Sequence, residues 1–93
     1  MNGEEDKMER LVYVCRHVFE NSNPVLLVCH ESDGDWQFLC GGTHNKEEPI
    51  VVGMEHILDR DRTLLVTLKI PPGWEAERRD VSSMWVYREK SEF

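Results

Sequence analysis

One tract, residues 24–42, constrains the fold more than any other part of the chain. Residues 25–29 (VLLVC) are apolar at every position, which is typical of a central strand. The Ser-Asp-Gly-Asp sequence at 32–35 supplies a residue that tolerates positive φ, as a tight hairpin turn requires. Residues 36–40 then alternate between a face with both aromatic rings and a face with Gln and Leu. The tract therefore predicts a strand, a tight turn and a second strand, which the Gly-Gly pair ends.

The segment before this tract predicts one further strand. Residues 11–19 (LVYVCRHVF) are rich in β-branched and aromatic side chains. Residues 20–24 read as a turn, since Asn and Ser bond their own backbone and Pro fixes φ. We expect the three strands to form an antiparallel meander.

Two helices are predicted after the meander. Residues 49–52 fit either a short strand or the lead-in to a helix, and periodicity does not separate the two. Apolar residues then recur at helical spacing in two groups, which residues 59–62 separate and for which Asp61 or Thr63 is the candidate N-cap. The two groups are Met54, Ile57 and Leu58, and Leu64, Leu65 and Leu68.

A final hairpin is predicted after Pro71-Pro-Gly73, because proline cannot continue a helix. Residues 74–78 and 83–88 are its two strands. The fold class is therefore α+β, with an antiparallel sheet of about five strands formed by the meander and the hairpin, and one or two short helices between them. Residues 1–10 are predicted to be a flexible acidic arm, and residues 11–90 a single globular domain.

The charge of the chain limits its partners. Eighteen acidic and eleven basic side chains give a formal net charge of -7. Nucleic acid and anionic membranes require a basic face, so we expect neither as a partner, whereas a basic protein is permitted. The polar N-terminal residues and the short apolar run at 25–29 predict neither a signal peptide nor a membrane span, and hence a cytoplasmic protein. Open sheet edges allow a monomer or a weak dimer.

Cysteine and histidine residues suggest one candidate site. If residues 11–19 form a strand, Cys15 and His17 point to the same face and could join Cys29 and Cys40 in a zinc site or a thiol site. The competing interpretation is that the cysteines are small buried hydrophobes. Because the Cys-x2-Cys spacing of a zinc knuckle and the signature of a cysteine hydrolase are both missing, we expect no cofactor and no enzymatic activity.

Acidic residues suggest a second candidate site, for a basic protein. Two loops carry the carboxylates, and Trp74 after the Pro-Pro-Gly sequence is a candidate interface anchor. The competing interpretation is that the acidic side chains are solvated turn residues. The candidate binding residues are Glu31, Asp33, Asp35, Glu47, Glu48 and Trp74.

Four segments together resemble a family. They are residues 14–18 (VCRHV), 24–28 (PVLLV), 33–42 with its Asp-Gly-Asp-Trp-Gln-Phe run and Gly-Gly pair, and 70–78 (IPPGWEAER). Their order is similar to that in small bacterial domains of unknown function that are grouped with the immunity proteins of polymorphic toxin systems (immunity protein 33-like). The resemblance implies a non-enzymatic inhibitor that binds a toxin. The chain departs from the family in having Cys-Gly-Gly at 40–42, where relatives often carry an acidic residue after a single Gly.

Overall fold

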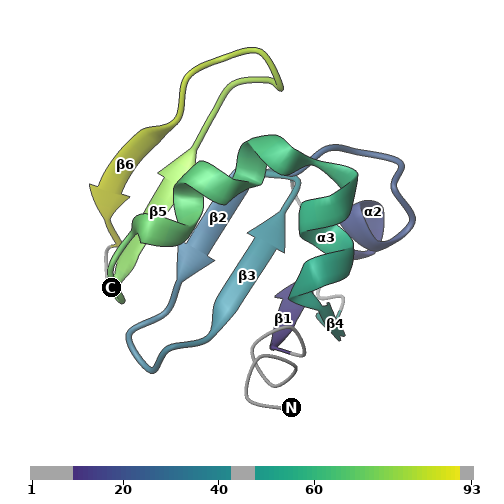
Figure 1. Ribbon diagram of the computed structural model, residues 1–93, viewed down its shortest axis with the longest axis horizontal. Helices are drawn as coiled ribbons and strands as arrows, with labels where there is room; N and C mark the ends of the chain where they lie inside the picture. Colours follow the sequence, from purple (N-terminus) through teal and green to yellow (C-terminus); the bar gives the residue numbers. More distant parts are fainter. Residues whose placement is uncertain (1–9, 43–47, 91–93) are drawn as a thin grey trace, which may run out of the picture.

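The protein forms one mixed sheet with a helical layer across one of its faces (Figure 1). The computed structural model describes residues 10–42 and 48–90. Its strands are arranged in the order β4-β1-β3-β2-β5-β6. The elements are β1 (Leu11–Val14), α2 (Arg16–Phe19), β2 (Leu27–His30), β3 (Trp36–Leu39), β4 (Ile50–Gly53), α3 (Met54–Arg60), the 3₁₀-helix η1 (Arg62–Lys69), β5 (Trp74–Glu77) and β6 (Val86–Glu89). The α+β class is confirmed.

The prediction of one strand over residues 11–19 was wrong in its second half. β1 ends at Val14, and the short helix α2 begins at Arg16. Val18 is buried on α2, and the guanidinium of Arg60 donates hydrogen bonds to the carbonyl oxygens of Val18 (2.8 Å) and Phe19 (3.3 Å). These tertiary contacts favour a helical turn where local propensity favours a strand.

The prediction of an antiparallel meander and of about five strands was also wrong. β1 pairs with β3 in parallel, with Val14 opposite Phe38, and not with β2. The sixth strand is β4, which pairs antiparallel with β1 and resolves the ambiguity over residues 49–52 in favour of a strand. The sheet is therefore mixed, because the chain leaves β1 through α2 and returns on the far side of β3.

Several local predictions are confirmed. β2 and β3 form an antiparallel hairpin in which Gly34 has φ of 100°, so the Asp-Gly sequence marks the turn correctly. The Asp61 side chain accepts a hydrogen bond from the Thr63 backbone N–H and thereby caps η1, which ends before Pro71. β5 and β6 form the C-terminal hairpin. The predicted N-terminal arm lies outside the described residues except for Arg10.

The two faces of the sheet differ in what covers them. α3 and η1 lie across the face to which Val14, Phe38 and Ala76 belong, and this side contains the core (Figure 1). We call the opposite face the open face, because in residues 10–42 and 48–90 no helix lies across it. None of the helices in the described part of the chain is long and apolar enough to cross a bilayer.

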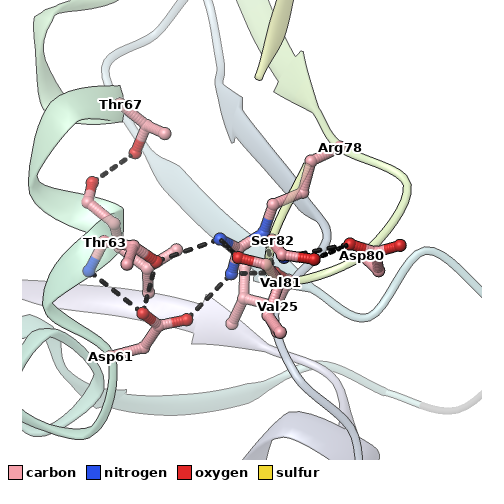
Figure 2. A network of polar contacts seen from close by, with 9 residues as sticks. Val25, Asp61, Thr63, Thr67, Arg78, Asp80, Val81 and Ser82 are labelled. Atoms are coloured by element: carbon pink, nitrogen blue, oxygen red, sulfur yellow. Dashed lines mark hydrogen bonds and ion pairs between the residues drawn. The ribbon is translucent and has the colours of Figure 1, made fainter. Parts of the chain in front are cut away.

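A buried arginine joins the helical layer to the sheet. Arg78 follows β5 and is 4% exposed. Its guanidinium donates to the Val25 carbonyl oxygen (3.1 and 2.9 Å), the Asp61 carboxylate (2.8 Å) and the Thr63 hydroxyl (3.0 Å) (Figure 2). The same group lies over the ring of Trp85, 4.4 Å from its centroid. These partners stand in two segments, the entry to β2 and the start of η1, so this one side chain fixes the position of the helical layer relative to the sheet.

Asp61 is the anionic partner of this arginine. Partial burial alone would raise the pKa of Asp61, but hydrogen bonds from Thr63 and Arg78 outweigh it and hold the pKa below its usual value. The carboxylate therefore stabilises the fold at pH values above the pKa that Asp has in an unfolded chain. That contribution is lost as the pH falls through the lower pKa of the folded state.

We expect Asp61→Asn to lower the free energy of unfolding by about 1.5–3 kcal/mol at pH 7, because it keeps the cap acceptor but removes the charge that faces a buried arginine. Asp59→Asn is the matched control, since the Asp59–Arg62 pair is fully solvated, and should cost less than about 1 kcal/mol. Urea unfolding measures both. The difference between wild type and Asp61→Asn should shrink below about pH 4; a difference that persists there would contradict the assigned charge role.

Candidate functional site

Parallel pairing of β1 and β3 brings two cysteines together. The carboxyl ends of parallel neighbours lie at the same edge of a sheet. Cys15 directly follows β1 and Cys40 directly follows β3, so both lie at that edge. The first turn of α2 adds His17 beside them. The ligand atoms of these three residues lie within 4.8 Å of one another, and we call the set the Cys-His-Cys group.

The Cys-His-Cys group is close-packed and mostly buried. Cys40 Sγ lies 3.6 Å from His17 Nδ1, both cysteines are buried, and His17 is half-buried. Burial raises the pKa of the Cys15 thiol, and the Cys40 thiol adds to the increase, whereas the backbone N–H groups of Val18 and Cys40 act in the opposite direction. Cys15 is therefore a neutral thiol near pH 7, unlike the thiolate of an activated cysteine nucleophile.

Cys29, the fourth member of the predicted set, lies elsewhere. In the β2–β3 register Cys29 is opposite Gln37, one position out of phase with Phe38, so its side chain is on the open face. Its thiol donates a long contact to the Glu75 carboxylate (3.8 Å). Three strands in one antiparallel register would have been needed to group all four residues, and β1 is not in that register.

The open face carries apolar side chains on four neighbouring strands. Every second residue of β4, β1, β3 and β2 has its side chain on the open face, and we call these residues outward. Gln37 is the one amide or charged residue among them. Leu11 and Val51 are diagonal neighbours on β1 and β4, and they are 64% and 51% exposed. The outward residues of these four strands are Leu11, Tyr13, Leu27, Cys29, Gln37, Leu39, Val51 and Gly53. A solvated sheet face would alternate to polar residues here, so this face has the composition of a contact surface.

A cavity opens between this apolar surface and the Cys-His-Cys group. Its volume is about 330 Å³. Leu27, Leu39 and Gln37 of the open face line it, together with Cys15 and the exposed Glu48. Sequence reasoning missed this surface, although the apolar residues 25–29 and 50–52 already place apolar side chains on both faces of their strands.

Charged residues occupy the other half of the open face, on β5 and β6 and just beyond the ends of β2 and β6. The Glu31 carboxylate accepts hydrogen bonds from Gln37 (2.6 Å) and Lys90 (2.7 Å). Arg88 donates to Glu75 (2.7 Å) and to Glu77 (2.6 Å). These charged groups are therefore paired with one another within the chain.

The predicted acidic binding residues do not form one patch. Asp33 and Asp35 are exposed in the β2–β3 turn, at the end of β3 opposite to the cavity that Glu48 lines. Glu31 is held by Lys90. The half-buried ring of Trp74 packs against the core. Glu47 lies outside the described residues.

Comparison with known proteins identifies no relative: no family model matches the chain, and neither a curated protein nor a solved structure does. The site is therefore interpreted from its own geometry.

The Cys29 thiol should make stability depend on alkaline pH. Burial first, and then Glu75 and Glu31, raise its pKa from 9.0 to about 11 against the opposing effect of Lys90. An unfolded chain loses the Cys29 proton near the lower value, so the contribution is complete below pH 9.0 and is lost as the pH rises to about 11.

We expect wild type to lose more stability than Cys29→Ala between pH 9.0 and about 11, by no more than about 2 kcal/mol after solvent screening. Urea unfolding at steps across this range measures the difference, and alkaline titrations of groups that do not interact with Cys29 cancel between the two proteins. Parallel pH profiles would show that Cys29 does not carry the effect.

Proposed function

We propose that the protein is a non-enzymatic binding module that docks a basic protein on the apolar half of its open face. The observation that carries this proposal is the set of apolar outward residues on four adjacent strands, with the cavity beside them. Leu11 and Val51 are more than half exposed on this face and its other outward residues are partly or fully buried. Exposed apolar side chains of this kind cost free energy unless a partner covers them.

Charge supports a basic partner. The chain carries a formal net charge of -7, and Glu48 is exposed at the cavity rim. Complementary charge accelerates encounter, whereas the apolar centre supplies most of the binding free energy. Asp33 and Asp35 stand at the far end of β3, where they contribute to the overall field rather than to the cavity rim.

The resemblance to toxin-immunity domains supports the same role. A module of that kind works by covering a partner's surface and needs no catalytic group. In this proposal the partner is a toxin with a basic face, and the protein inhibits the toxin by occluding that face. The internal ion pairs of Arg88 and Lys90 leave the apolar half of the face as the part available for contact.

The test begins with capture of a partner from the native host on tagged protein, release by salt, and expression of the recovered partner as a recombinant protein. Leu11→Lys with Val51→Lys then places two positive charges on the apolar surface. We expect this double variant to bind the purified partner at least about 10-fold more weakly by calorimetry, which corresponds to about 1.4 kcal/mol.

The matched control is Leu65→Lys with Val66→Lys. Leu65 and Val66 are exposed on η1, at 43% and 46%, and lie away from the open face. Both double variants raise the net charge equally, so a general charge effect would weaken both alike. Equal affinity of wild type and the Leu11/Val51 variant for the purified partner would contradict docking on the open face.

A further inference from the structure

We propose that the Cys-His-Cys group is a zinc site, in which Cys15, His17 and Cys40 supply three ligands. This site is separate from the proposed docking of a protein, since it needs neither the partner nor the exposed apolar residues. Cys29, on the opposite face of the sheet, takes no part in it.

The donor types are those that zinc prefers. Thiolate sulfur and imidazole nitrogen are the common ligands of tetrahedral zinc in proteins. Hard cations such as calcium and magnesium prefer oxygen ligands, so two sulfurs and a ring nitrogen select against them. Three such donors in one small group are more specific than any of them alone.

The observed spacing is close to that of a loaded site. With zinc–sulfur bonds of about 2.3 Å and zinc–nitrogen bonds of about 2.0 Å, tetrahedral angles separate a sulfur from a nitrogen by about 3.5 Å and two sulfurs by about 3.8 Å. Cys40 Sγ and His17 Nδ1 are 3.6 Å apart, and all three ligand atoms lie within 4.8 Å of one another. The separations of the ligand atoms therefore exceed those around a bound zinc by about 1 Å at most.

The surroundings also suit a bound ion. Cys15 also lines the cavity of about 330 Å³, so one residue of the group borders space that opens to solvent. Within residues 10–42 and 48–90 the group supplies three ligands, one fewer than the four of a tetrahedral zinc site.

The ligands come from two segments of the chain that meet at this edge of the sheet. Cys15 and His17 belong to the β1–α2 junction, and Cys40 stands at the end of β3. An ion at this point would cross-link them beyond the register that Tyr13 and Val14 set with β3. Bound zinc should therefore raise the thermal midpoint, because a ligand that binds only the folded state stabilises it.

The test uses full-length protein, reduced and kept under inert gas, and titrates it with Co²⁺ as the spectroscopic substitute for zinc. We expect saturation at a single ion per chain, thiolate-to-cobalt charge-transfer absorption, the visible bands of tetrahedral cobalt, and displacement of the cobalt by Zn²⁺. A reduced, folded wild type that shows no charge-transfer absorption would overturn the proposal.

Variants then assign the ligands. Cys15→Ser and Cys40→Ser should each remove about half of the charge-transfer intensity and weaken Zn²⁺ binding by more than about 100-fold, because changes outside the ligand set already cost 10- to 100-fold. His17→Asn should weaken binding but keep the sulfur bands of the ion that is bound. Cys29→Ser is the matched control and should leave the spectrum unchanged; loss of the bands in this variant would overturn the ligand assignment.

A second measurement does not depend on the folding of the variants. Wild-type protein is alkylated with iodoacetamide with and without Zn²⁺, and the modified cysteines are identified by mass spectrometry. We expect Zn²⁺ to slow alkylation of Cys15 and Cys40 by at least about 10-fold and to leave Cys29 unchanged, because a coordinated sulfur is a poorer nucleophile. Equal rates with and without the metal at Cys15 and Cys40 would exclude the site.

Discussion

Arg78 joins three segments that lie far apart in the sequence: the entry to β2, the start of η1 and the β5–β6 connection. Its guanidinium is desolvated, so each of its donors must find an acceptor in the protein. The carbonyl oxygen of Val25 and the carboxylate of Asp61 meet that requirement from opposite sides (Figure 2). Any shift of the helical layer relative to the sheet would leave a buried charge unpaired, which makes the position of this layer strongly specified.

Once the helical layer is fixed on one face, the other face is left to its own side chains. The helices in the described part of the chain pack their buried residues, among them Ile57 and Leu64, against the core face. Charged pairs on β5 and β6, and the Glu31–Lys90 pair just beyond the ends of β2 and β6, make half of the open face compatible with water. The strands β4, β1, β3 and β2 lack such pairs and present apolar residues, so exposure is costly there and contact is favourable. This asymmetry within a single face is the physical basis of the proposed docking surface.

Local features of the fold could be predicted from the sequence, and non-local ones could not. The turn at Gly34, the cap at Asp61 and the stop at Pro71 each depend on the conformational preference of one or two residues, so they can be read along the chain. The pairing of β1 with β3 depends on how α2 turns the chain after Val14, and that turn is stabilised by Arg60, more than 40 residues later. No local pattern encodes such a contact, so the sheet order was missed.

The same limit explains why the residue types of the candidate zinc site could be predicted but not their grouping. Their residue types alone made Cys15, His17 and Cys40 candidates in the sequence. Whether Cys29 joins them depends on strand register, because a shift of one position exchanges the two faces of a sheet. Cys15 then connects the two proposals, because its sulfur belongs to the Cys-His-Cys group while the residue also lines the cavity beside the apolar surface. An ion held by Cys15 would order that end of the cavity, so zinc binding and docking, although chemically separate, would favour the same arrangement of β1 and β3.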